Sequence, residues 1–107
     1  MKLIIAIVSK EDSSMVMKQL VKKKFFVTKL ASSGGFLRSG NTTLMIGTKD
    51  DSVENAISII TEYSKSRREL VPSSIASEFG MFSTIPVEVN VGGATLFIVD
   101  VEKMIKI

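Results

Sequence analysis

The order of short apolar segments along this chain constrains its fold more than any other feature. Residues 2–9 are rich in Ile and Val and predict a buried first strand. Lys10, Glu11 and Asp12 follow at once, which favours a strand over a signal peptide and predicts a cytoplasmic protein. No apolar run approaches the roughly 18 residues of a membrane span, so none is expected. Similar apolar patterns predict strands over residues 25–31, 41–48, 86–91 and 94–101.

Two segments with helical periodicity separate these strands. One of residues 12–14 is expected to cap the first helix, whose apolar positions recur as far as Lys23. Residues 50–52 are expected to cap the second helix, because their acidic side chains suit the positive end of a helix dipole. This helix is predicted to end near Arg67 or Arg68.

The resulting order is β-α-β-β-α-β with an extra strand, in a single domain of residues 1–107. It predicts an α+β, ferredoxin-like sandwich with both helices on one face of the sheet. Apolar residues such as Leu44 and Met45 nevertheless point to both faces of the strands. Since helices can cover only one face, the other is expected to meet copies of the same chain, which predicts a homo-oligomer.

The composition excludes several classes of chemistry. The chain has no Cys and no His, which removes disulfides, thiolate nucleophiles, Ser-His triads and zinc sites built on these residues. The remaining acidic pairs are better explained as helix caps, so we expect no enzyme, no metal and no separate cofactor. The net charge is only +3, with one Tyr and no Trp, and the basic clusters suit solvated helix ends. No nucleic-acid partner is expected.

A glycine-rich loop, residues 32–40, is the most informative stretch of the sequence. Residues 35–42 almost match a phosphate-binding loop, but Asn41 stands where that motif needs Lys and a strand follows where it needs a helix. The glycines of the loop can turn backbone N–H groups toward a ligand, and Phe36 can stack on a base. The Asn41 amide can read a purine edge, and Thr28 and Thr42 add hydroxyls. These residues favour a nucleotide site over an ordinary turn.

Two motifs then make the chain similar to a known family. The stretch from Thr28 to Gly47, with Gly34-Gly35-Phe36-Leu37 and Ser39-Gly40-Asn41-Thr42-Thr43, resembles the hallmark of the PII-like cyclic-di-AMP receptors of Gram-positive bacteria. Pro86-Val87-Glu88-Val89 and Val91-Gly92-Gly93-Ala94-Thr95 resemble their C-terminal signature. The resemblance implies a homotrimeric signal-transduction protein that binds the cyclic dinucleotide between subunits.

The resemblance also implies roles for individual residues. Thr28 and Asn41 would make polar contacts with the ligand, and Gly47 would allow its close approach. Gly35, Phe36 and Leu37 would wrap its base and phosphate region. The long loop after the second helix, residues 72–85, would reorganise on binding and present a surface to a downstream protein that the sequence does not identify.

The sequence departs from the family pattern at two positions beside this site. Phe26 replaces an Arg, and Lys24 replaces an Asn. Lys24, Lys29 or Arg38 would then compensate for the lost guanidinium by meeting the phosphates. Two alternatives follow: a diverged module that binds another adenine nucleotide, or a protein-interaction trimer that binds none.

Overall fold

The computed structural model describes residues 1–30, 40–71 and 87–107. Within these ranges the chain forms β-strands and α-helices in an order close to the expected one, with one short 3-10 turn, η1. The elements are β1 (Lys2–Ser9), α1 (Lys10–Lys22), β2 (Phe26–Leu30), β3 (Asn41–Thr48), η1 (Asp50–Ser52), α2 (Val53–Ser64), β4 (Arg67–Val71), β5 (Val87–Val91) and β6 (Ala94–Asp100).

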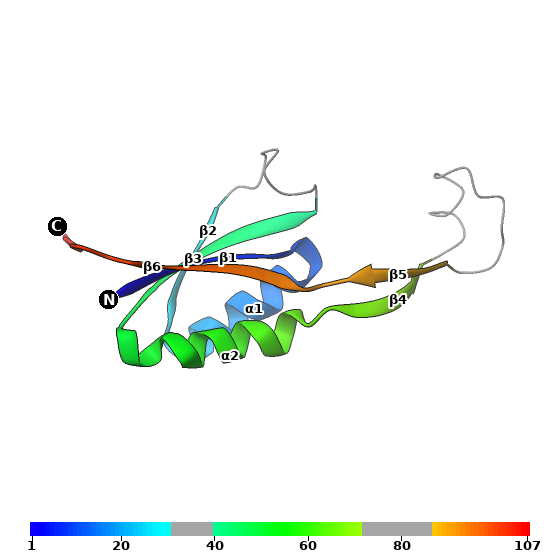
Figure 1. Cartoon of the computed structure of the whole chain (residues 1–107), viewed down its shortest axis with the longest axis horizontal. Coiled ribbons are helices and arrows are strands. Elements are labelled where there is room, and N and C mark those ends of the chain that lie inside the picture. The colour runs from blue at the N-terminus through cyan, green and yellow to red at the C-terminus, as the bar shows by residue number, and fades with distance from the viewer. Residues whose placement is uncertain (31–39, 72–86) are drawn as a thin grey trace.

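A four-stranded sheet with strand order β2-β3-β1-β6 forms the body of the protein, and all neighbouring strands are antiparallel. Both helices lie on one side of this sheet (Figure 1). The predicted α+β class, with an antiparallel sheet and two helices, is therefore confirmed, and the strand order is compatible with a ferredoxin-like sandwich. Neither helix of the described ranges, at 13 and 12 residues, is long and apolar enough to cross a membrane.

The core lies between the sheet and the two helices. Every second residue of β1 and β3 faces the helices, as the period of two in a strand requires. Small or branched side chains fill this layer and exclude water from it almost completely. Its buried members include Ile4, Ala6, Val8, Leu44 and Ile46 from the sheet and Val16, Leu20, Ala56 and Ile60 from the helices.

A second, two-stranded sheet extends from this body. β4 and β5 pair antiparallel, from Arg67 opposite Val91 to Val71 opposite Val87, and we call these two strands the arm. Figure 1 shows the arm projecting beyond the helices, so that the molecule is 56 Å long but only 26 and 18 Å across. The strand expected over residues 86–91 thus pairs outside the main sheet.

The predicted end of the second helix is wrong. α2 ends at Ser64, and residues 67–71, which include Arg67 and Arg68, form a strand. Charged residues at this point suggested a solvated helix end, whereas pairing with β5 determines the observed structure. The long loop predicted over residues 72–85 lies outside the described ranges, as does residue 86.

The predicted start of the first helix is also wrong. α1 begins at Lys10 with Ser9 as its N-cap, so residues 12–14 lie inside the helix instead of before it. Asp12 and Ser13 are buried there. Ser13 donates from its hydroxyl to the Lys10 carbonyl at 2.8 Å, and Asp12 has a partner described below.

The C-terminal end of α1 has the hydrogen bonds of a Schellman motif. The Phe25 N–H donates to the Leu20 carbonyl at 3.0 Å, and the Lys24 N–H donates to that of Val21 at 2.9 Å. Lys24 has a φ of +68°, the left-handed conformation that this motif requires and that glycine usually adopts. The turn directs the chain into β2 and packs Phe25 against the core.

Candidate functional site

The strand register places three of the predicted ligand residues on the same face of the sheet. Thr42, Leu44, Ile46 and Thr48 of β3 are buried toward the helices, so the alternate residues of β3 point to the opposite side. Paired residues of antiparallel strands share a face. We call this side the open face; it comprises Leu3, Ile5, Ile7, Ser9, Phe26, Thr28, Leu30, Asn41, Thr43, Met45, Gly47, Thr95, Phe97 and Val99.

Thr28 and Gly47 lie near one end of the open face. Thr28 is paired with Met45, and Phe26 with Gly47. An added Cβ at Gly47 would meet no heavy atom of the described residues within 4 Å. Gly47 therefore leaves a bare stretch of backbone beside the Phe26 side chain, which is 86% exposed.

Asn41 lies at the other end of β3, half-buried and paired with Ser9. Asn41 is six residues from Gly47, or about 20 Å at the rise of a strand, and Thr28 lies between them. The structure thus brings the three residues to one face, with Thr28 near Gly47 and Asn41 at a distance from both. Gly35, Phe36, Leu37 and Arg38 lie outside the described residues.

The backbone conformation of Gly40 sets the direction in which the chain enters β3 at Asn41. Its φ is +98°, a left-handed value that other residues adopt only with strain. This conformation directs the Gly40 carbonyl to the first residue of α1, where the Lys10 N–H donates to it at 2.6 Å. The start of β3 is therefore anchored to the N-terminal end of α1, whose unpaired N–H groups need such acceptors.

Lys29, one of the predicted compensating cations, does not share the open face with Thr28. Lys29 pairs with the buried Leu44, so it projects from the edge strand toward the helix side. Lys24 precedes β2 and lies at the end of that strand away from Leu30. Among the described residues, the open face carries no Lys or Arg. Any phosphate on it would have to meet backbone N–H groups, hydroxyls or groups from elsewhere.

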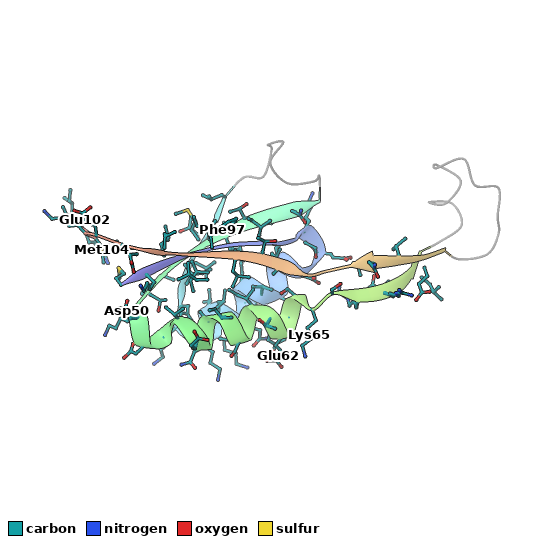
Figure 2. All side chains as sticks on the ribbon, viewed as in Figure 1. Asp50, Glu62, Lys65, Phe97, Glu102 and Met104 are labelled. Atoms are coloured by element: carbon teal, nitrogen blue, oxygen red, sulfur yellow. The ribbon has the colours of Figure 1, made fainter. Side chains whose placement is uncertain are left out.

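Apolar side chains dominate the rest of the open face. Phe97 is 44% exposed, and Val99 and Leu30 are exposed to a similar degree. In Figure 2, Phe97 points away from the helix layer. A contiguous apolar surface of this kind on a small domain is typical of a face that meets another protein surface.

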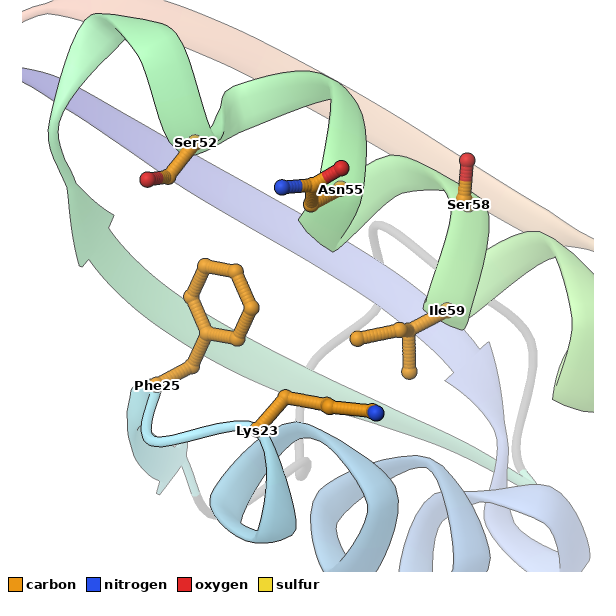
Figure 3. Close-up of a pocket in the computed structure, with 6 residues that line it drawn as sticks. All are labelled: Lys23, Phe25, Ser52, Asn55, Ser58 and Ile59. Carbon is orange, nitrogen blue, oxygen red and sulfur yellow. The ribbon is translucent and has the colours of Figure 1, made fainter.

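A separate pocket of about 440 Å³ lies on the opposite side of the molecule, between the C-terminal end of α1 and the start of α2 (Figure 3). It is open and mixed in polarity, and it contains none of the predicted ligand residues. Lys23 is its one charged side chain. Its lining consists of Lys23, Phe25, Ser52, Asn55, Ser58 and Ile59.

An ion pair that no sequence pattern predicted joins α1 to the arm. The Arg67 guanidinium donates from Nη2 to Asp12 Oδ1 at 2.9 Å and from Nη1 to Asp12 Oδ2 at 3.2 Å. The Ser9 hydroxyl donates to Asp12 Oδ2 at 2.8 Å. The hydrogen bonds from Arg67 hold the pKa of the Asp12 carboxyl below its usual range, although burial acts in the opposite direction. The same bonds raise the pKa of Arg67.

Comparison with known proteins identifies the family. The family described as "Cyclic-di-AMP receptor" matches residues 1–107, the whole chain. The crystal structure of a functionally unknown protein from Pediococcus pentosaceus is 35% identical and superposes with a TM-score of 0.79. That similarity covers 99% of this chain and 96% of the other. Fold and sequence therefore agree along the entire length, and the chain belongs to the cyclic-di-AMP receptor family.

Proposed function

We propose that this protein is a non-catalytic signalling receptor that binds cyclic-di-AMP between the subunits of a PII-like homotrimer. The observation that carries this proposal is the common face of Thr28, Asn41 and Gly47, in a chain that belongs to the receptor family throughout its length. The ligand would order the chain around Asn41 and change the surface that the protein offers to a downstream partner.

The separation between Asn41 and Gly47 supports a site built between subunits. About 20 Å of β3 lies between these residues in one chain. A ligand in a cleft between two copies can contact the Asn41 end of one subunit and the Gly47 end of the next. The exposed apolar residues of the open face, with Phe26 and Phe97 foremost, supply the surface on which copies would pack.

Calorimetry with purified protein tests the proposal. We expect cyclic-di-AMP to bind, Asn41→Ala to weaken binding at least tenfold, and the matched Asn90→Ala change in β5 to leave it unaltered. Asn55→Ala, in the pocket between the helices, serves as a second comparison. Loss of binding in Asn55→Ala with retention in Asn41→Ala would move the site to the pocket and refute the proposal.

Mixed oligomers test the arrangement between subunits. Asn41→Ala and Gly47→Val subunits are each expected to bind poorly alone. If one site uses Asn41 from one subunit and Gly47 from another, refolding the two variants together restores binding at a fraction of the sites. A mixture no better than its components, or a protein that sediments as a monomer, would contradict this arrangement.

Another adenine nucleotide is the second candidate ligand. The departures from the family pattern favour it, because Phe26 in place of an Arg and Lys24 in place of an Asn change the groups available to a nucleotide. A thermal-shift panel of cyclic-di-AMP, cyclic-di-GMP, ATP and ADP separates the two candidates. Stabilisation by ATP or ADP without stabilisation by cyclic-di-AMP would support this second function.

A further inference from the structure

The Asp12 carboxylate joins α1, the start of the arm and the N-cap of the helix at one point. Only 9% of its side chain is exposed. Its oxygens accept hydrogen bonds from both terminal nitrogens of Arg67 and from the Ser9 hydroxyl. A carboxylate with three donors in a nearly buried position holds a defined geometry, because a bidentate guanidinium pair restricts both distance and orientation.

Arg67 is the first residue of β4 and ties the arm to the body. Its Nη1 also donates to the Lys65 carbonyl at 3.2 Å, and its Nε donates to Glu69 at 3.1 Å. The other strand of the arm is attached next to it, since the Gly93 N–H donates to the Ser64 carbonyl at 2.5 Å. The arm thus meets the body at a narrow junction, where the Asp12–Arg67 pair is a side-chain link across to α1.

Gly92 makes room for this link. It has a φ of +81°. A Cβ at Gly92 would lie 2.5 Å from the Lys65 carbonyl oxygen, 2.6 Å from Arg67 Nη1 and 3.3 Å from Asp12 Oδ2. Any side chain at position 92 would therefore collide with the ion pair or with the backbone beside it. The junction is built closely around the contact between Asp12 and Arg67.

The residues where β1 ends and α1 begins also contact the Asn41 end of β3. Ser9 is the pairing partner of Asn41, and the Lys10 N–H donates to the Gly40 carbonyl. Residues 9–12 therefore contact the candidate ligand site on one side and the arm on the other. A single helical turn separates the two contacts, and a turn of helix is a stiff connection.

We propose that residues 9–12 and the Asp12–Arg67 pair couple ligand binding at Asn41 to the ordering of the arm. Ligand contact at Asn41 stabilises the Gly40–Lys10 hydrogen bond and, through the first turn of α1, the position of Asp12. Arg67 then holds the arm in one orientation relative to the body. This coupling rests on the proposed function, because it takes the occupied Asn41 site as its input. By linkage, a change that frees the arm also weakens ligand binding.

Hydrogen exchange of the arm amides, residues 67–71 and 87–91, tests the coupling. Cyclic-di-AMP is expected to slow exchange in the native protein by about fivefold or more, the lower end of typical allosteric coupling. Arg67→Met removes the guanidinium but keeps the length of the chain, and it should abolish this response. Arg68→Met is the matched control, because Arg68 lies on the same strand and is 69% exposed, with only a distant Glu88 partner at 3.9 Å.

If Arg67→Met folds poorly, Asp12→Asn tests the same coupling. This substitution keeps the shape of the side chain and removes its charge. An unchanged ligand response in both Arg67→Met and Asp12→Asn overturns the coupling. Hydrogen exchange of the arm amides, measured without ligand, distinguishes failure of the coupling from failure of the proposed function. If the native protein binds no cyclic-di-AMP, the coupling and the proposed function both fail, yet faster arm exchange in Arg67→Met than in Arg68→Met still establishes the link to the body.

Discussion

Phe26 lies directly opposite Gly47 in the β2–β3 ladder, so an exposed ring stands beside a residue that has no side chain. A glycine inside a strand lowers stability, because it adds backbone entropy to the unfolded chain and packs nothing. The described part of a single subunit offers no steric reason for it, since an added Cβ would meet nothing within 4 Å. The reason that we propose is the close approach of a ligand to this face.

Gly47→Val is expected to bind cyclic-di-AMP at least tenfold more weakly while the fold is kept. The valine side chain would occupy the space that the ligand needs, but a β-branched residue suits the strand and should add about 0.5–1 kcal/mol of stability. Urea denaturation and calorimetry on the same preparation check both halves. Unchanged affinity in a stable variant would contradict a role for Gly47 in the site; Gly47→Ala, with a single added methyl group, should show a smaller effect.

Phe26→Arg is expected to increase affinity for cyclic-di-AMP. A guanidinium at this position of the open face can donate charge-assisted hydrogen bonds worth about 1.5–3 kcal/mol, which corresponds to a roughly tenfold to hundredfold gain. Phe26→Gln, a polar residue without charge, is the control and should gain little. Affinity that is equal or lower in Phe26→Arg, with the oligomer intact by sedimentation, would show that no phosphate comes near this position.

Lys24→Gly is expected to stabilise the protein by up to about 1 kcal/mol. Lys24 occupies the left-handed position of the Schellman motif, where a Cβ is unfavourable and glycine is not. Lys23→Gly is the matched control: Lys23 has a φ of −90° and gains nothing from glycine. Denaturation midpoints measure both variants, and a loss of stability in Lys24→Gly would show that its side chain makes a contact of its own.

Asp12→Asn should destabilise the protein at neutral pH by about 1.5–3 kcal/mol, because it weakens hydrogen bonds between charged groups. The charges at this site are those of Asp12, Arg67, Glu11 and Glu69. Folding lowers the pKa of Asp12. The contribution of the ionised Asp12 to the free energy of unfolding is therefore present above the ordinary carboxyl pKa of about 4. It is lost as the pH falls through the pKa of Asp12 in the folded protein.

The difference between the native protein and Asp12→Asn should therefore shrink below about pH 4. Urea titrations at neutral pH and at about pH 3 measure it. Glu62→Gln, an exposed change near the end of α2, is the control and should cost little at either pH. A stability difference that stays constant across this range would show that the Asp12 carboxylate is not the group responsible.

Local pattern predicted most of the body, because short apolar runs such as residues 3–8 and 44–46 mark strands of its sheet. It failed where distant pairing decides the structure. Arg67 and Arg68 resemble a helix end in sequence, and only the partner strand β5 makes them part of a sheet.

The candidate site shows the same limit. Thr28, Asn41 and Gly47 could be identified from their motif, and their common face follows from register. Asp12 and Arg67 are 55 positions apart, and no local pattern connects them. The local sequence predicts a helix cap at one of residues 12–14, Asp12 among them, because an acid near a helix start usually has that role. The actual role of Asp12 depends on where the arm leaves the body.

The two strands of the arm leave and re-enter the body at adjacent points, marked by the hydrogen bond between Gly93 and Ser64. A short turn across that gap would be enough to close the sandwich, so the fold of the body does not depend on the length or composition of what is inserted there. A segment of another length could therefore take the place of the arm without a change in the strand order of the body.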